Sequence, residues 1–264
     1  MEHPTATRRM PAVFVGHGSP MLALEDSAET REIARIGQKV LTDYGRPKAI
    51  LMVSAHWYEP ANLVQHEAHP RQVFDMYGFP RALYEVKYEP EGSADLSKAI
   101  EGLRELGVRI DNSWGIDHGA WTVLVHMFPD ADIPVVQLSV NSAAGAQGCY
   151  DIGSRLARLR DAGYLVIGSG NVVHNLRRVE WDNPHGTAET EAFNSFIIEA
   201  VGKRDDTAVI RYGDHPLHRY AVPTPDHFLP LLYVLGATQG ERSTVFNNTC
   251  NLGSMAMTGF FFGD

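Results

Sequence analysis

Four of the twelve histidines lie where a short apolar run ends or where a helix is expected to begin: His17, His56, His174 and His227. The runs 12–15, 50–53 and 164–167, which precede the first three, are almost wholly apolar, as in strands that a parallel sheet buries on both faces. Ligands of open α/β sheets bind just beyond the carboxyl ends of the strands. Because neutral imidazole is the commonest protein ligand of metals, we predict that these four histidines hold a metal ion.

The fourth of these histidines, His227, is expected at the start of an apolar helix over 225–236. Thr224 suits the N-cap of that helix, and Pro225 suits its first position. The dipole of the helix disfavours an added positive charge at its N-terminus, so it opposes protonation of His227. The ring is therefore expected to stay available as a ligand.

A fifth histidine, His118, follows Asp117 and precedes the apolar helix expected after Gly119. Histidine titrates near neutral pH, so His118 could move a proton or donate a hydrogen bond to a substrate. It could also serve only to anchor its loop. We predict the catalytic role for His118.

Expected strands and helices alternate along the chain, which predicts one α/β domain. We expect this single catalytic domain to span residues 1–264, with 1–10 as a loose lead-in, and 59–90, rich in proline and aromatic residues, as a lid or pocket wall. Further strands are expected at 133–140 and within 244–262. Further helices are expected at 27–44, 93–106, 119–128, 153–162 and 190–201.

The composition excludes several classes of partner. The net charge is -9 and lysine and arginine form no cluster, so we expect no nucleic-acid partner. No apolar stretch approaches the roughly 18 to 20 residues that span a bilayer, and the first residues lack the apolar core of a secretory signal. Cys149 and Cys250 have no CxxC spacing and suit a reduced environment. We therefore expect a cytoplasmic protein that does not associate with membranes.

Five motifs together resemble the class III extradiol ring-cleavage dioxygenases, and most closely their 4,5-DOPA extradiol dioxygenase-like branch. The motifs follow one another in the order found in that family and extend over most of the chain. Only the five motifs together are specific for the family. It implies a single α/β domain with a central mixed sheet flanked by helices on both faces. The motifs are GHGSPM (16–21), SAHW (54–57), GIDHGAW (115–121), GSGNVVHNL (168–176) and PTPDHFLPLLYVLGA (223–237).

The resemblance also implies roles for the histidines in opening a catechol ring, DOPA-like in this branch, with O2. His17 and His56 match two family ligands of a mononuclear non-haem metal. His227 falls at the third ligand position, where protocatechuate-cleaving relatives have a glutamate. His174 matches the base that acts on the catechol and could also reach the metal, and His118 matches a histidine that contacts the substrate or oxygen side.

One divalent metal ion per chain is expected, and its identity stays open at this stage. Fe(II) is expected for dioxygenase activity, whereas an all-imidazole site also suits Zn(II), which has no redox chemistry. Two other functions stay open: a zinc-dependent hydrolase assisted by Asp117 or Asp226, and a non-catalytic metal-binding relative. The sequence leaves the physiological catechol, the position of ring cleavage and the oligomeric state undetermined.

Overall fold

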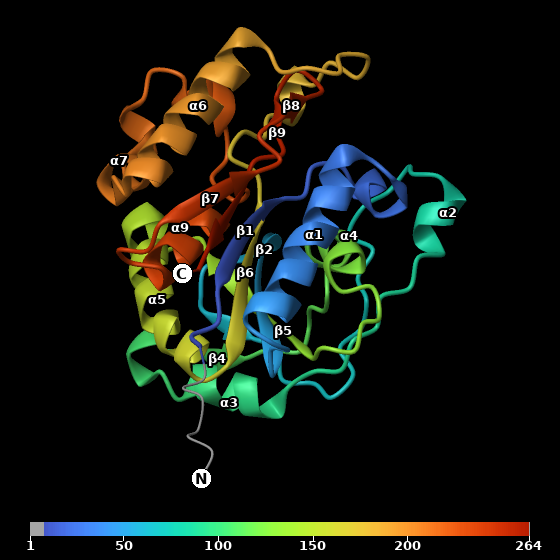
Figure 1. Cartoon of the computed structure of the whole chain (residues 1–264), viewed down its shortest axis with the longest axis vertical. Helices are drawn as coiled ribbons and strands as arrows, with labels where there is room; N and C mark the ends of the chain where they lie inside the picture. Colours follow the sequence, from blue (N-terminus) through green and yellow to red (C-terminus); the bar gives the residue numbers. More distant parts are fainter. Residues whose placement is uncertain (1–7, 264) are drawn as a thin grey trace.

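The computed structural model describes residues 8–263, which form one α/β domain around an eight-stranded mixed sheet (Figure 1). The central strands β2, β6 and β1 are neighbours and run parallel, whereas β10 pairs antiparallel with β1. The expected α/β fold with a mixed sheet is confirmed. The strands in sheet order are β4 (Arg109–Ile110), β3 (Leu63–Val64), β5 (Val135–Asn141), β2 (Ala49–Glu59), β6 (Tyr164–Gly170), β1 (Ala12–Gly16), β10 (Gly259–Phe262) and β7 (Ser243–Phe246).

Helices cover both faces of this sheet. On one face α1 (Ala28–Asp43) and α4 (His118–Met127) pack around Trp121, and on the other α5 (Gly145–Asp161) and α9 (Leu229–Ala237) pack around Tyr233 (Figure 1). Each helix buries an apolar face against the strands, which is what holds the layers together. The other α-helices are α2 (Arg81–Tyr84), α3 (Ala94–Glu101), α6 (Ala188–Lys203), α7 (Asp206–Ile210) and α8 (His218–Ala221), and a small hairpin pairs β8 (Cys250–Asn251) with β9 (Met255–Ala256).

Two strands extend beyond their expected ends. The expectation that the second strand stops at His56 is wrong, because β2 continues to Glu59. Its pairing with β5 shifts register between Val53 and Tyr58, so His56 lies in an irregular part of the strand. Residues 168–170, which follow the expected strand, complete β6, because they pair with β1 up to Gly16.

Two helices begin at other residues than expected. The helix predicted over 225–236 begins at Leu229, because Pro230 lacks an amide hydrogen and fits only the first turn of a helix. His227 consequently lies in the turn before α9 and does not open it. The helix predicted at 153–162 begins earlier, at Gly145, as part of α5.

The expected lead-in over residues 1–10 includes residues 1–7, which lie outside the described part of the chain. The prediction is wrong for Met10, whose side chain is buried and whose backbone amide donates a hydrogen bond to the Arg160 carbonyl over 3.1 Å.

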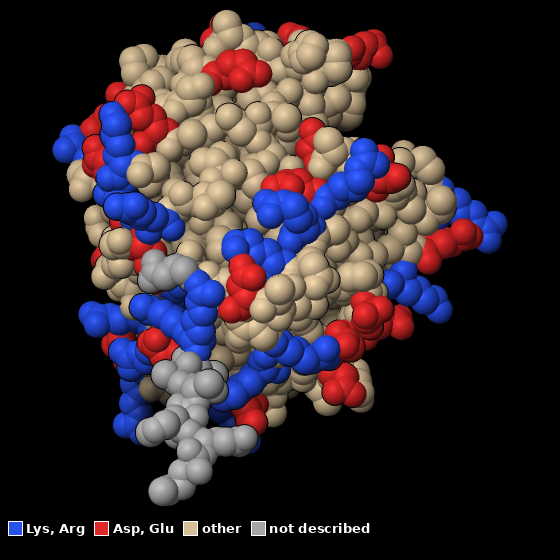
Figure 2. Space-filling model, viewed as in Figure 1, with Lys and Arg blue, Asp and Glu red and all other residues tan. Residues whose placement is uncertain are grey.

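Charged side chains of both signs are interspersed on the face shown in Figure 2, and they are sparser in its upper half. Over the described residues, no helix is both long enough and apolar enough to cross a membrane.

Candidate metal centre

The fold brings all five predicted histidines together near the carboxyl ends of the three central strands. His17 follows β1, His56 lies on β2 and His118 is the first residue of α4. His174 follows β6 by four residues and His227 lies before α9. The ring centroids of His17, His56 and His227 are 5.0–5.1 Å apart, pair by pair.

Two nitrogens of this cluster have the spacing of two ligands of one metal ion. The Nε2 atoms of His17 and His56 lie 3.3 Å apart. Two imidazole nitrogens bound to one tetrahedral ion at about 2.0–2.1 Å are themselves about 3.3–3.4 Å apart. Among residues 8–263, His17, His56 and His118 form the one group whose ligand atoms all lie within 4.8 Å of one another. The spacing of these three histidines therefore fits a divalent metal, whereas His227 and His174, which were also predicted as ligands, lie outside this group.

Hydrogen bonds at Nδ1 determine which nitrogen of His17 and His56 faces this site. His17 Nδ1 lies 3.0 Å from Ser169 Oγ, and that hydroxyl donates its own hydrogen to the Gly119 carbonyl over 2.5 Å. The His17 ring must therefore donate at Nδ1, which leaves a lone pair on Nε2. His56 Nδ1 lies 3.0 Å from an Asp75 oxygen, a pure acceptor, with the same result.

The same relation holds for two further rings. His118 Nδ1 lies 2.9 Å from the other Asp75 oxygen, and His227 Nδ1 bonds the Asp226 carboxylate. A carboxylate acting on the far nitrogen of a ligating histidine fixes the tautomer and orientation of the ring, and it raises the basicity of the ligand. The four rings thus all present an unprotonated Nε2 when they are neutral.

His174 is held differently. Its ring stacks face to face on His227, with centroids 3.6 Å apart and an interplanar angle of 5°. Its backbone amide donates to the Ala221 carbonyl, and the residue pairs with Met255 in an isolated bridge. Burial lowers the pKa of His174 to about 2, and His227 adds to this shift. The ring is therefore neutral near pH 7 and keeps a lone pair.

Burial and neighbouring charges shift the pKa values of His17 and His227 downwards, which favours the neutral ring that a metal needs, but they shift that of His56 upwards. Burial, reinforced by His56, lowers the pKa of His17 well below its ordinary value. Burial also lowers the pKa of His227, although the bond to Asp226 opposes it. At His56 burial acts in the same direction, but the bond to Asp75 and the charge of Asp117 outweigh it and raise the pKa.

The Asp75 carboxylate stays ionised. Burial acts to raise its pKa, but the hydrogen bonds from His118 and His56 lower it well below the usual range. An anionic acceptor is therefore present for both rings.

Glycines allow the turn that carries His227 to approach β6. A Cβ on Gly170 would lie 2.1 Å from the His227 carbonyl oxygen, and one on Gly168 would lie 2.7 Å from the Pro230 carbonyl oxygen. Any side chain at these positions would push the turn away from the sheet. Gly168 and Gly170 therefore allow His227 to take its position in the site.

Asp117, considered above as an assistant to a zinc hydrolase, has another role in the structure. It caps α4 and is fully buried, and it accepts hydrogen bonds from Ser54 Oγ, Trp114 Nε1 and Gln137 Nε2. These donors occupy the carboxylate, so nothing directs it towards a metal-bound water.

Neither Asp75 nor Ser169 is predicted from the sequence as a partner of the site. Asp75 lies in the proline- and aromatic-rich segment 59–90, 43 residues before His118, and no spacing connects the two. Ser169 belongs to the motif GSGNVVHNL, and its place between two glycines is the one signal in the sequence that points to it.

The chain matches known proteins over nearly its whole length. Residues 11–262 match the family model described as the catalytic LigB subunit of aromatic ring-opening dioxygenase. A 4,5-DOPA dioxygenase extradiol of Escherichia coli (strain K12) is 41% identical over 262 residues, which cover 96% of this chain and 94% of that protein. A 4,5-DOPA dioxygenase extradiol of Beta vulgaris is 33% identical over 255 residues, covering 94% and 95% of the two chains. A crystal structure of an uncharacterized E. coli K12 protein superimposes with a TM-score of 0.84 at 38% identity, covering 97% of this chain and 100% of that one.

Proposed function

Because the chain belongs to the family of catalytic LigB subunits of aromatic ring-opening dioxygenases, we propose that it opens the ring of a catechol with O2 at a mononuclear metal site. The chain is an aromatic ring-opening dioxygenase of this metal-dependent family. The names of two relatives support a DOPA-like catechol as substrate and extradiol cleavage as the reaction. Fe(II) is the proposed working metal, because a redox-active ion can pass electrons from the catechol to O2 and Zn(II) cannot.

One observation supports the metal site above the others. Four histidine rings have Nδ1 bonded to a protein oxygen, and the Nε2 atoms of two of them lie 3.3 Å apart. Uncompensated lone pairs at that distance repel each other, and a bound cation removes the repulsion. We propose His17, His56 and His227 as ligands, with His174 able to complete the set.

The chain's own residues would bind the catechol and move its protons. The metal, when bound, would hold the two ring oxygens and O2 together and pass electrons between them. His174 is neutral, so it can take a phenolic proton at a ring nitrogen. His118 would move a proton on the oxygen side, because its bond to Asp75 occupies Nδ1 and leaves Nε2 to exchange the proton.

The test is reconstitution of the purified chain with Fe(II) under anaerobic conditions, followed by a panel of catechols that includes 3,4-dihydroxyphenylalanine. The expected result is uptake of one O2 for each ring opened, with both atoms of 18O2 in the product. Activity that persists without O2 would instead indicate a hydrolase. Failure to open any catechol at full iron loading would contradict the proposal.

Two controls accompany this experiment. The zinc-loaded chain keeps a divalent ion in the site without redox chemistry, so it should open no ring. His185→Ala removes an exposed histidine outside the cluster and should leave iron content and turnover unchanged.

We also propose that the enzyme works in the cytoplasm. The support is the pair of free, buried thiols of Cys149 and Cys250, which suit a reducing compartment.

A further inference from the structure

One carboxylate, that of Asp75, joins two histidines of the site. Its Oδ2 lies 3.0 Å from His56 Nδ1, and its Oδ1 lies 2.9 Å from His118 Nδ1. The Asp75 side chain is 12% exposed, so little water competes for either bond. We propose that Asp75 is a positioning residue that sets the tautomers of His56 and His118 together, an inference that rests on the proposed metal site.

The chemistry of a carboxylate suits this double role. Both of its oxygens are acceptors, so both rings must donate from Nδ1 and both must leave Nε2 unprotonated. His118 is bound a second time, because its backbone amide donates to Asp75 Oδ1 over 3.0 Å. That amide belongs to the first turn of α4, where it has no partner within the helix. Asp75 thus ties the first turn of α4 to the ring of His56 on β2.

The segment that carries Asp75 is itself held against the start of α4. The Val73 amide donates to the Ile116 carbonyl over 2.8 Å, and the Ile116 amide donates to the Arg71 carbonyl over 2.9 Å. Trp121 Nε1 donates to the Val73 carbonyl over 3.0 Å. Asp75 therefore extends from a braced strand-like run, and its carboxylate has a defined position relative to both rings.

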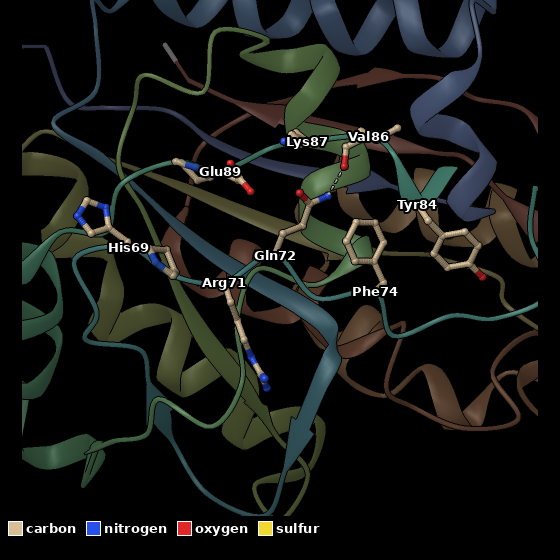
Figure 3. A pocket seen from close by; sticks show the side chains of 10 residues that line it. His69, Arg71, Gln72, Phe74, Tyr84, Val86, Lys87 and Glu89 are labelled. Atoms are coloured by element: carbon tan, nitrogen blue, oxygen red, sulfur yellow. Dashed lines mark hydrogen bonds between the residues drawn. The ribbon is translucent and has the colours of Figure 1, made fainter. Parts of the chain in front are cut away.

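Gln72 and Phe74, from the same segment, line a pocket of about 590 Å³ whose lining includes none of the five histidines. Contacts around this pocket also hold the segment in place. Figure 3 shows the Gln72 side chain turned towards Val86, to whose carbonyl it donates over 3.1 Å. The Gln72 side-chain oxygen also accepts from the Tyr88 amide over 2.9 Å. Phe74 lies beside Tyr84 in Figure 3, and it packs against Trp121. Residues 71–75 are thus held on both sides, and Asp75 extends from them to the two histidines.

Replacing Asp75 by asparagine separates this role from a general structural one. An amide has one acceptor oxygen and an NH2 donor, so only one of the two rings can still donate to it. The other ring must accept at Nδ1 and carry its proton on Nε2, and a nitrogen that carries a proton cannot bind a metal. The shape of the side chain is almost unchanged, so the packing of the segment stays as it is.

The experiment compares the wild-type chain, Asp75→Asn and Asp75→Glu by two readouts that need no substrate. Long-range 15N–1H spectra of the metal-free chain report which ring nitrogen of each histidine carries a proton. Competition with a chromophoric chelator reports the zinc affinity. In Asp75→Asn we expect one of His56 and His118 to move its proton to Nε2, and we expect zinc affinity to fall by about 10–100-fold, the usual effect of losing such a partner.

Glu85→Gln is the matched control. It removes a carboxylate from the same segment, one that is 59% exposed and pairs only with Arg81 among the contacts described. Zinc affinity and both tautomers should stay at wild-type values in this variant. An Asp75→Asn chain that folds with unchanged tautomers and unchanged zinc affinity would overturn the inference.

If Asp75→Asn does not fold, Asp75→Glu takes its place, because glutamate keeps both acceptors. We then expect His56 and His118 to keep their protons on Nδ1; a proton on Nε2 of either ring with wild-type zinc affinity would overturn the inference. A wild-type chain that binds zinc through these rings but opens no catechol would overturn the proposed function and leave the role of Asp75 standing.

Discussion

Ser169 donates its hydroxyl hydrogen to the Gly119 carbonyl and accepts a hydrogen bond from His17 Nδ1 over 3.0 Å. The backbone of α4 thus determines, through one hydroxyl on β6, which nitrogen of His17 is free to bind a metal. All of these atoms are buried, so water cannot replace the serine.

Ser169→Ala should therefore weaken metal binding without removing a ligand. The His17 ring loses the acceptor that holds its proton on Nδ1, so we expect zinc affinity to fall by about 10-fold or more. Chelator competition on the purified variant measures this. Ser154→Ala, which removes a hydroxyl on α5 that bonds the Asp151 carbonyl, is the control and should bind zinc as the wild type does. Equal affinities of the two variants would contradict the prediction.

Alanine variants should distinguish ligands from His118. His17→Ala or His56→Ala should lower metal occupancy and turnover together. His118→Ala should keep one metal per chain, while turnover falls by about 10²–10⁴-fold, the scale for losing a positioned proton-transfer group. Metal analysis and O2 uptake on the same iron-loaded samples measure both quantities. One nitrogen each of His17, His56 and His118 lie within 4.8 Å of one another, so their positions alone do not separate His118 from the ligands. The metal content of the variant decides between the two roles. Loss of metal from His118→Ala with normal activity per iron would make it a ligand.

His174→Ala tests whether that ring is a base or a ligand. It stacks on His227, and burial lowers its pKa to about 2, so the ring is neutral but a weak base in the metal-free chain. If it is the base, turnover should fall far more than metal content does. The measurement is iron content and single-turnover ring opening in the same preparation. A variant that loses its iron first would show that His174 acts chiefly as a ligand.

Gly170→Ala should damage both stability and the site. Its Cβ would lie 2.1 Å from the His227 carbonyl oxygen, so the turn that carries His227 must move. We expect a loss of about 1–3 kcal/mol in the free energy of unfolding and a lower zinc affinity. Gly202→Ala is the control: it lies on α6 with nothing within 4 Å, and it should stabilise the chain by about 0.5–1 kcal/mol. Urea unfolding and chelator competition test both variants.

The two thiols should be inert in the folded chain. Burial raises the pKa of Cys149 and of Cys250 to about 12 in each case. At pH 8 only about one thiol in ten thousand would then be ionised, and the thiolate is the reactive form. We expect iodoacetamide to label neither residue in native protein and to label both in urea. Mass spectrometry after a timed exposure at pH 8 reads the result, and rapid labelling of native protein would contradict it.

Local patterns in the sequence were enough to predict the parallel centre of the sheet and the histidines near its carboxyl ends. A strand buried on both faces must be apolar along its whole length, so the runs before His17 and His56 are visible without any tertiary information. The motif set indicated the family for a related reason, since turns and close approaches restrict residue types locally. The metal-binding and catalytic roles of these histidines stay predictions.

Only the tertiary structure decided how the rings are held and aimed. The register shift in β2 at His56 and the turn before α9 at His227 depend on pairing and packing with other segments. The partnership of Asp75 with His56 and His118 joins three separate segments of the chain. A hydrogen bond between side chains distant in sequence depends on the final positions of both backbones, and no periodicity in either segment encodes it. The sequence therefore indicates which histidines gather at the site, whereas the tautomer of each ring depends on hydrogen bonds that form only in the folded chain.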